Sequence, residues 1–482
     1  MDKMTTPWKC LAVVALASLS GLTKASEDKL TLEDCHLDGI SQQVECGKLQ
    51  VPENYQYPTG DQLTINFAVL PAIDRNQNKE PIMFLAGGPG QAAVSLAGGL
   101  YQAFNEVRKT RDIILVDQRG TGKSHPLQCE DDLELDPYTY MPEAYTAANV
   151  KSCIDKLEGD LSQFNSENAI RDFDAVRAAL GHEKIAIYGG SYGTRAGLVY
   201  MRLFPESLSA VVLDSVGPIE VPIGLFGKSS ERSFNMLIEN CQQDTSCQQA
   251  YPNLRQQFNQ LIAQLEKQPV TIDIAHPTLG SKTEFLVSRA KFLSTIFTML
   301  YGMETRSLVP LVIDQAAKGN FSPLAGVIAS AGMGEMYVGL TLNIVCNEDI
   351  PKVTPSMFTE DANNSFNGNL SHFAWNTACP VWPQYRPSED FYQPVTTDVA
   401  TLIISGDLDP VTPPSNGEYS NKTLPNSKHI IMKDSSHTPG VSACAIKMIA
   451  EFLDKKNPND LDESCLADIP KESFMLGLNG GA

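Results

Sequence analysis

Short apolar runs in the N-terminal part of the chain predict the beginning of a β-sheet. Residues 47–51 and 62–70 flank a Pro/Gly turn, and the second run alternates toward apolar positions, which predicts an antiparallel pair of strands. Residues 81–85 and 112–116 are apolar runs that end in glycine-bearing loops, a pattern typical of buried parallel strands. We therefore expect a sheet that starts antiparallel and continues with parallel strands.

Helices and strands then alternate along the chain. Residues 168–180 carry apolar side chains at helical spacing, and Gly181 provides a C-terminal stop. A predicted strand at 184–188, a helix at about 194–204 and a strand at 208–213 follow in turn. This alternation is typical of a doubly wound sheet, so the predicted fold class is α/β.

The alternation stops between about residues 218 and 394, where helical patterns dominate. Residues 254–265, for example, place their apolar side chains on one helical face. Strand patterns return at 401–405 and 429–432, and a closing apolar helix follows at 443–453. A mainly helical insertion into an α/β core explains this order.

The N-terminus has the pattern of a secretory leader. Lys3 and Lys9 precede an apolar run at residues 11–22, and a Thr-Lys-Ala sequence ends at Ala25. The apolar run is shorter than the roughly 20 residues that span a bilayer. We therefore expect cleavage after Ala25 and an exported mature protein, periplasmic or extracellular, without stable membrane insertion. An uncleaved N-terminal anchor is the alternative.

These patterns divide the 482 residues into four segments. Residues 1–25 are the predicted signal peptide, and residues 26–217 form the N-terminal part of the α/β core. Residues 218–394 form a mainly helical cap, and residues 395–482 form the C-terminal part of the core. A chain of this length is long enough for two or more domains, but large α/β enzymes also grow by insertion.

The composition is that of a folded, enzyme-sized protein, with 42% hydrophobic and 20% charged residues. The formal net charge of -20 repels phosphates and anionic headgroups, which argues against nucleic acid or anionic lipid as a partner. The acidic balance favours solubility but identifies no ligand.

Ten cysteines follow the predicted leader, an even number that predicts disulfides in an exported protein. Sequence neighbours form the candidate pairs Cys35 with Cys46, Cys129 with Cys153, Cys241 with Cys247, Cys346 with Cys379, and Cys444 with Cys465. Other connectivities remain open, and buried free thiols are the alternative that an oxidising compartment disfavours. No metal site is expected, because the chain has no Cys-x-x-Cys or His-Glu-x-x-His spacing.

The run Gly-Gly-Ser-Tyr-Gly at residues 189–193 lies between a predicted strand and a predicted helix. A nucleophile elbow requires this context, because small residues on either side of the serine let the neighbouring backbone pass closely while the hydroxyl projects at the helix N-terminus. Ser191 is therefore the candidate nucleophile. An ordinary glycine-rich turn is the alternative.

A nucleophilic serine needs a base within hydrogen-bonding reach and a carboxylate that orients the base. His437 is the candidate base because it lies between the last predicted strand and the last helix, where this fold order places it. The loop after the preceding strand carries Asp407 and Asp409. Asp409 is the candidate acid because Pro410 fixes the turn behind it, whereas Asp407 is expected to cap its own turn.

An oxyanion intermediate needs backbone N–H donors, each typically contributing about 3–4 kcal/mol. Tyr192 N–H, directly after the serine, is one candidate. The run Ala-Gly-Gly-Pro-Gly at residues 86–90 follows an early strand and offers Gly88 or Gly87 as the second. A tight turn without a catalytic role is the alternative for this glycine run.

Four motifs together resemble the prolyl aminopeptidase and tripeptidyl aminopeptidase family of α/β-hydrolases. They are Gly-Gly-Pro-Gly at residues 87–90, Asp-Gln-Arg-Gly-Thr-Gly at 117–122, the serine motif at 189–193 and Gly-Asp-Leu-Asp-Pro-Val-Thr-Pro at 406–413. The C-terminal segment is similar to that of secreted tripeptidyl-aminopeptidase-like proteins. The resemblance implies a cap that shapes the pocket and the removal of short units from free peptide N-termini. The mechanism it implies requires no cofactor.

Prolyl aminopeptidases usually carry His before the Gly-Gly-Pro-Gly motif and Gly after it, whereas this chain has Ala86 and Gln91. Proline-only specificity is therefore not implied. An aminopeptidase needs carboxylates to hold the substrate ammonium, because burying that charge unpaired is costly. Glu348 and Asp349, close to Cys346, are the hypothetical amine clamp, and solvated loop acids are the alternative.

The predicted function is an exported serine peptidase that releases a tripeptide, a dipeptide or a single residue from peptide substrates through a Ser-His-Asp acyl-enzyme mechanism. A carboxylesterase or another small-acyl hydrolase is the first alternative, since it uses the same triad with an apolar pocket. A hydrolase fold used only for binding is the second alternative. Its usual signature is a missing triad member, and all three are present here.

Overall fold

The computed structural model describes residue 1 and residues 30–77, 79–129, 146–276, 280–330 and 336–480. Apart from Met1, the predicted signal peptide falls outside these residues, so its cleavage after Ala25 stays a prediction. Within the described ranges, no helix combines the length and the apolar character that crossing a membrane requires.

Nine strands of the described chain form one sheet: β1 Leu30–Cys35, β2 Val44–Pro52, β3 Gln62–Leu70, β4 Ile82–Leu85, β5 Ile113–Val116, β6 Ile185–Gly190, β7 Leu208–Asp214, β10 Thr401–Gly406 and β11 Ser427–Met432. Their order is β1-β2-β3-β5-β4-β6-β7-β10-β11. The pairs from β1 to β5 are antiparallel, and those from β5 to β11 are parallel. The predicted antiparallel start and parallel continuation are confirmed, while β1 is a strand that no sequence pattern indicated.

The central parallel strands β4 and β5 are apolar throughout because both faces of the sheet are covered there. In β5, Ile113 and Leu115 pack into one core, whereas Ile114 and Val116 pack into another. All four side chains are at most 2% exposed. Successive side chains of a strand point to opposite faces, so a strand in the middle of this sheet needs apolar residues at every position.

Helices cover both faces of the sheet: α1 Ala97–Ala103, α2 Asn105–Arg108, α5 Ser166–Ala179, α6 Tyr192–Leu203, α17 Pro414–Thr423 and α18 Ala443–Lys455. A further helix, α4 Ala147–Ile154, packs instead in a small separate cluster with Trp382. Apolar residues of α5 and α6 belong to one core, and those of α1, α2 and α18 to the other. Helix α5 begins where the Asn165 side chain accepts a hydrogen bond from Asn168 N–H, and it ends before Gly181, whose φ is 80°. The α/β fold class is confirmed.

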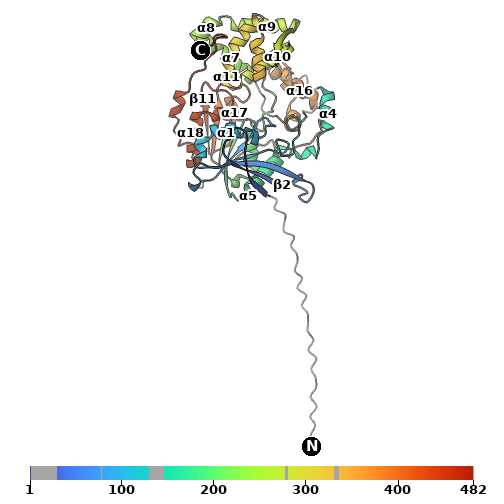
Figure 1. Cartoon of the computed structure of the whole chain (residues 1–482), viewed down its shortest axis with the longest axis vertical. Coiled ribbons are helices and arrows are strands. Elements are labelled where there is room, and N and C mark those ends of the chain that lie inside the picture. The colour runs from blue at the N-terminus through green and yellow to red at the C-terminus, as the bar shows by residue number, and fades with distance from the viewer. Residues whose placement is uncertain (2–29, 78, 130–145, 277–279, 331–335, 481–482) are drawn as a thin grey trace.

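Between β7 and β10 the described chain is mainly helical: α7 Gly227–Gln243, α8 Thr245–Ala250, α9 Leu254–Lys267, α10 Arg289–Met299, α11 Met303–Arg306, α12 Val309–Ala317, α13 Ser322–Ser330, α14 Val338–Ile344, α15 Pro355–Asn363 and α16 Leu370–Ala378. Figure 1 shows α7 to α10 gathered at the end of the molecule opposite β2 and α5. Apolar residues of α7, α9, α10, α12 and α13 form a core of their own. The segment boundaries at 217/218 and 394/395 stay predictions.

A hairpin interrupts these helices, and the helical patterns did not indicate it. Its strands are β8 Val270–Ala275 and β9 Lys282–Val287, which pair antiparallel. Along β8, the half-buried Val270, Ile272 and Ile274 alternate with exposed residues. A period-2 signal was therefore present in the sequence, within a region where the helical period is stronger.

The C-terminal segment after α18 returns to these helices, where Met475 O accepts from the hydroxyl of Tyr251, directly after α8, at 2.6 Å. Glu472 forms an ion pair with Arg306 at the end of α11. Phe474 is buried in the core of the helices, and Met475 N–H donates to Ser307 O at 3.0 Å. The end of the chain therefore ties the sheet to the helical region.

The predicted cysteine pairs all form disulfides, namely Cys35–Cys46, Cys129–Cys153, Cys241–Cys247, Cys346–Cys379 and Cys444–Cys465. Each closes a loop within 33 residues of sequence. In the chain-entropy account, closing loops of this length stabilises a fold by about 2–4 kcal/mol per bond. Cys346–Cys379 restrains the segment that carries Glu348 and Asp349.

Candidate active site

Ser191 lies at the turn between β6 and α6, with a positive φ that residues other than glycine rarely adopt. Its φ is 56° and its ψ is -123°, and its N–H donates to Asp214 O at 2.9 Å. The flanking glycines are required sterically: a Cβ at Gly189 would lie 2.2 Å from Gly193 O, and one at Gly193 would lie 2.0 Å from Leu85 O. This strained, closely packed turn is the geometry of a nucleophile elbow.

Asp409, in the loop after β10, lies against His437 in the loop after β11. Asp409 Oδ2 is 2.8 Å from His437 Nδ1 and also accepts from Thr412 Oγ1 at 2.8 Å. Asp409 Oδ1 accepts from the N–H groups of Val411 and Thr412, both at 2.8 Å. The structure thus brings the predicted acid and the predicted base together, with the carboxylate held by backbone donors.

The electrostatics of this pair follow from its contacts. Burial of Asp409 opposes ionisation, but His437 and the hydrogen-bond donors outweigh burial and lower the pKa of Asp409. Burial of His437 opposes protonation, but Asp409 and Asp214 outweigh it and raise the pKa of His437. A base held in this way keeps its proton on Nδ1, which leaves Nε2 to exchange a proton.

Asp407, the competing aspartate, does not reach His437. Its Oδ1 accepts only a long hydrogen bond, 3.4 Å from Ser435 N, and burial raises its pKa. Asp407 therefore supports the loop that carries the histidine, by binding the neighbouring loop instead of capping its own turn.

The helical region holds the histidine loop directly, through residues that the sequence did not single out. His437 N–H donates to Tyr301 O at 3.1 Å, and Ser436 Oγ donates to Leu300 O at 2.5 Å. The Tyr301 ring lies edge-on to the His437 ring, with 5.2 Å between centroids. Leu300 and Tyr301 directly follow α10. Nothing in the local sequence indicates that they contact a loop more than a hundred residues away.

A cavity of about 700 Å³ lies over the elbow. Ser191, His437, Gly88 and Tyr192 all line it. Many of its other walls are apolar, for example Ile223, Phe226, Phe297, Met336, Val338 and Trp375. Among the described residues, no aspartate or glutamate lines this cavity.

The candidate oxyanion donors lie beside the nucleophile. A Cβ at Gly87 would lie 3.3 Å from the Ser191 Cβ, so the glycine run passes directly against the elbow. Gly87 N–H donates to Gln91 Oε1 at 3.2 Å. Of the two glycines that the sequence left open, Gly87 therefore already has a partner for its N–H, and Gly88 stays the candidate donor, together with Tyr192 at the first position of α6.

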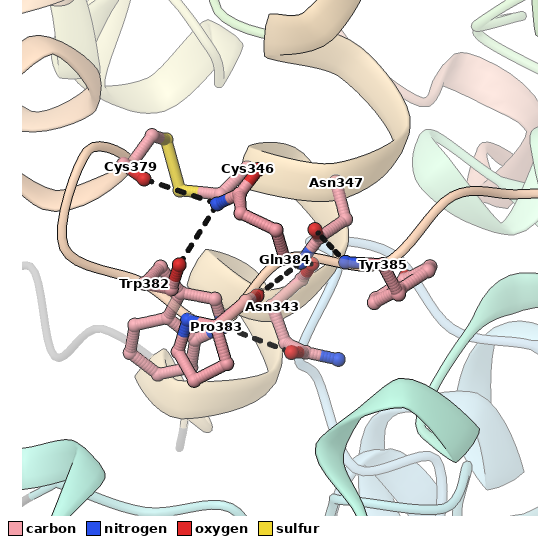
Figure 2. Close-up of a disulfide and its surroundings, with 8 residues drawn as sticks. All are labelled: Asn343, Cys346, Asn347, Cys379, Trp382, Pro383, Gln384 and Tyr385. Atoms are coloured by element: carbon pink, nitrogen blue, oxygen red, sulfur yellow. Dashed lines mark hydrogen bonds between the residues drawn. A yellow bond between two sulfur atoms is a disulfide. The ribbon is translucent and has the colours of Figure 1, made fainter.

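Glu348 and Asp349 lie in a π-helical turn, Val345–Asp349, that continues α14. Figure 2 shows how this turn is held: Cys346 is bonded to Cys379, and Tyr385 N–H donates to Asn347 Oδ1 at 2.7 Å. Such turns often mark functional sites, because the extra residue reorients nearby side chains. Neither Glu348 nor Asp349 lines the cavity at Ser191.

Both acids are buried and engaged with the protein itself. Asp349 pairs with Arg195 Nη1 at 2.8 Å and accepts from Ile223 N at 2.8 Å. Glu348 accepts from Ser166 N at 2.9 Å, from Ser166 Oγ at 2.6 Å and from Tyr385 Oη at 3.1 Å. Burial raises the pKa of Glu348 to about 7. The alternative of solvated loop acids is wrong for both residues, which are at most 1% exposed.

Glu348 borders a second, polar cavity of about 530 Å³, which is separate from the one at Ser191. Its walls include Arg171, Tyr385, Arg386 and Asn168. Ser166 Oγ, which binds Glu348, is also 2.8 Å from the Tyr192 hydroxyl, so this cavity and the elbow share a hydrogen-bonded connection. No three His, Cys, Asp or Glu side chains of the described chain are arranged to hold a metal ion.

Comparison with known proteins adds two family matches and several relatives. The family described as alpha/beta hydrolase fold matches residues 80–281, and the family described as TAP-like protein matches residues 366–465. The first match contains the elbow and the glycine run, and the second contains Asp409 and His437. Together they cover the loops that the structure brings to one cavity.

The relatives include named peptidases. The chain is 29% identical over 279 residues to serine protease Hip1 of Mycobacterium tuberculosis, covering 51% of this chain and 53% of that protein. It is 30% identical over 217 residues to tripeptidyl aminopeptidase of Streptomyces lividans, covering 40% and 39%. It is 24% identical over 403 residues to putative hydrolase YuaR of Escherichia coli, covering 78% of each.

The matches span about half of the length of Hip1 and less of the tripeptidyl aminopeptidase. The fold of this chain combines a mostly parallel sheet, an elbow after β6, and an acid and a histidine after β10 and β11. The chain has the α/β-hydrolase fold, and its C-terminal part matches the family described as TAP-like protein.

Proposed function

We propose that the protein is an exported serine peptidase that releases short units, from a single residue to a tripeptide, from peptide N-termini. The observation that carries the catalytic part is the 2.8 Å contact between His437 Nδ1 and Asp409 Oδ2 at a cavity that Ser191 also lines. An oriented histidine beside an elbow serine is the arrangement that acyl transfer requires. The peptidase assignment is supported by the relatives named serine protease and tripeptidyl aminopeptidase.

In the proposed mechanism, His437 Nε2 takes the proton of Ser191 Oγ as that oxygen attacks the scissile carbonyl carbon. Asp409 holds the Nδ1 proton and stabilises the imidazolium that forms. The N–H groups of Tyr192 and Gly88 donate to the oxyanion. His437 then protonates the leaving amine as the C–N bond breaks, and a water activated by the same base hydrolyses the acyl-enzyme.

Selection for free N-termini requires a group that binds the substrate ammonium. Glu348 and Asp349 remain our proposed clamp, although Asp349 is already paired with Arg195 at 2.8 Å. For Glu348 to serve, the substrate N-terminus has to reach the polar cavity of about 530 Å³. In this proposal the segment 218–394 acts as the cap, and its apolar side chains receive the side chain at the cleaved bond.

Hydrolysis of small acyl esters is a second candidate, and the lining of the cavity favours it. Phe226, Phe297 and Trp375 line the cavity, and within the described chain no carboxylate does. An ester substrate needs no ammonium site, so an apolar pocket is sufficient for its acyl group. The two candidates share the same three residues and differ only in what the pocket selects.

Export is supported by two independent features. The N-terminal pattern ending at Ala25 is that of a cleaved leader, and the ten cysteines that follow it form five disulfides. Stable disulfides require an oxidising compartment. We therefore propose a periplasmic or extracellular location.

The test uses purified mature protein and a panel of free and N-blocked chromogenic amides of one, two and three residues, alongside short acyl esters. Ser191→Ala is the control in every assay. Turnover of free-amine peptides that is lost on N-blocking and in Ser191→Ala is expected for an aminopeptidase. Turnover of esters alone refutes the peptidase assignment, and near wild-type turnover by Ser191→Ala refutes the nucleophile.

A further inference from the structure

Asp214 is a fully buried acid that the mechanism described above does not use. It is the last residue of β7, the strand between β6 and β10, and its exposed fraction is 0%. Its Oδ2 accepts from the Tyr188 hydroxyl at 2.5 Å and from Gly440 N–H at 2.9 Å. Its Oδ1 is buried and has no hydrogen-bond partner in the described structure.

The end of β7 also contacts the loop of the candidate base. Gly440, which donates to Asp214, lies three residues after His437. Ser215, the neighbour of Asp214, accepts from Thr438 N–H through its hydroxyl at 2.8 Å, and its φ is 62°. The Asp214 carbonyl also accepts the N–H of Ser191. One short segment therefore contacts both the nucleophile turn and the histidine loop.

Binding Tyr188 and Gly440 requires only one oxygen, which an asparagine would also provide. The second oxygen is buried without a donor, so no hydrogen bond offsets its desolvation. A buried carboxylate of this kind either takes up a proton or is stabilised by a nearby cation. The titratable groups that face Asp214 are Tyr188, His437 and Asp409, and of these only His437 becomes a cation.

We propose that Asp214 is a second acid of the candidate base, a positioning residue that holds the His437 loop and stabilises the imidazolium formed when His437 takes the serine proton. The inference deepens the proposed function, on which its kinetic part rests. Asp409 remains the residue that contacts His437 Nδ1, and Asp214 acts on the same ring through its charge and through the loop.

The electrostatics agree with this geometry. Burial raises the pKa of Asp214 to about 7, against the opposing effects of the Tyr188 hydroxyl, His437 and Gly440 N–H. Asp214 in turn contributes, after Asp409, to raising the pKa of His437. Removing the Asp214 charge should therefore lower the pKa of His437.

The decisive experiment is an NMR titration of the labelled histidine rings in the wild-type protein, Asp214→Asn and Tyr188→Phe, with His437→Gln to assign the resonance. In Asp214→Asn the pKa of His437 should fall by about one pH unit. Tyr188→Phe removes a donor from the Asp214 carboxylate and so raises the pKa of Asp214, which is then ionised to a smaller extent. The pKa of His437 should therefore fall by less than in Asp214→Asn. Asp407→Asn is the matched control, because it binds the same loop through Ser435 N–H yet is not among the groups that shift His437.

Kinetics of the same variants provide the second readout. Asp214→Asn should lower kcat about tenfold with KM nearly unchanged, and should move the acid limb of kcat/KM to lower pH. An unchanged His437 pKa in Asp214→Asn overturns the inference. If that variant does not fold, an unchanged pKa in Tyr188→Phe overturns it instead. Absence of Ser191-dependent turnover in the wild type refutes the proposed function and leaves the titration result standing.

Discussion

The loop after β10 and the π-helical turn Val345–Asp349 both bury acidic side chains, but the two regions use the charge differently. Asp409 in the loop faces His437 at 2.8 Å, and although burial opposes its ionisation, its partners lower its pKa. Glu348 in the turn faces Ser166 and Tyr385, and burial raises its pKa to about 7. Asp349 beside it is paired with Arg195.

The difference lies in the partner and not in burial. A histidine titrates near neutral pH, so a carboxylate that faces it can control a proton transfer. A guanidinium does not lose its proton, so a carboxylate that faces Arg195 holds the structure together. A buried acid near an active-site cavity therefore identifies a catalytic function only when its partner can exchange protons.

The largest test of this comparison is Asp409→Asn. The amide leaves the packing intact but favours the wrong histidine tautomer, and in a serine triad such a change lowers kcat by about 10⁴-fold. Asp407→Asn, two residues away, should stay within a few-fold of the wild type because Asp407 does not reach His437. Steady-state kinetics on the best substrate of the panel measures both. A larger loss of kcat in Asp407→Asn than in Asp409→Asn would mean that Asp407, and not Asp409, orients His437.

Asp349→Asn should act on stability. It leaves the buried Arg195 guanidinium, whose Nε already lacks a partner, without its anion, and breaking a buried pair in this way costs about 3–5 kcal/mol. Urea unfolding measures the change. The matched control is Asp273→Asn, which breaks the exposed pair with Lys282 and should change the free energy of unfolding little. Equal losses in the two variants would show that burial does not determine how much an ion pair contributes to the free energy of unfolding.

Glu348→Gln tests the raised pKa of Glu348 through the pH dependence of stability. A carboxyl with a folded pKa of about 7 and an unfolded value near 4.5 binds more protons when folded, so its contribution to stability is complete below about pH 4.5 and is lost as pH rises through 7. The loss amounts to about 3 kcal/mol. Because glutamine does not titrate, the variant should gain stability relative to the wild type as pH rises. Unfolding free energies at pH 5 and pH 8 check the sign, and a constant difference would contradict the raised pKa.

The smallest expected effect belongs to Tyr301→Leu. The substitution keeps the backbone bond from His437 N–H but removes the ring 5.2 Å from the imidazole, and aromatic pairs contribute about 0.5–1.5 kcal/mol. We expect kcat to fall about 2- to 10-fold. Phe297→Leu is the control, because Phe297 lines the cavity but packs on Tyr301 and not on His437, so it should change mainly KM. Equal losses of kcat would mean that the Tyr301 ring only fills space.

Much of the core and of the candidate triad could be predicted from local patterns. Gly189 and Gly193 must be glycine because a Cβ would meet backbone oxygen at 2.2 and 2.0 Å, and such a requirement is visible in a five-residue motif. His437 and Asp409 each follow a strand whose apolar pattern is clear. The parallel strands end at one edge of the sheet, so residues that follow them meet without any further information.

Contacts between the helical region and the loops that follow the sheet strands could not be predicted from local patterns. Tyr301 and Leu300 bind the histidine loop through backbone oxygens, which carry no sequence signal. Asp214 ends a strand that local sequence presents only as apolar, and its closeness to His437 depends on how β7 packs between β6 and β10. The hairpin β8–β9 had a period-2 pattern that the surrounding helical period obscured.

The sequence by itself determined the α/β order, the elbow at Ser191, the candidate acid and base, and the neighbouring cysteine pairs, because strand period, turn sterics and short loop closures are local properties. Only the tertiary structure decided what each buried acid faces. Arg195 and Asp349 are 154 residues apart, and Ser166 and Glu348 are 182 apart. At such separations the partner depends on how the helical region is placed on the sheet, and that partner determines whether a carboxylate moves a proton or holds the fold.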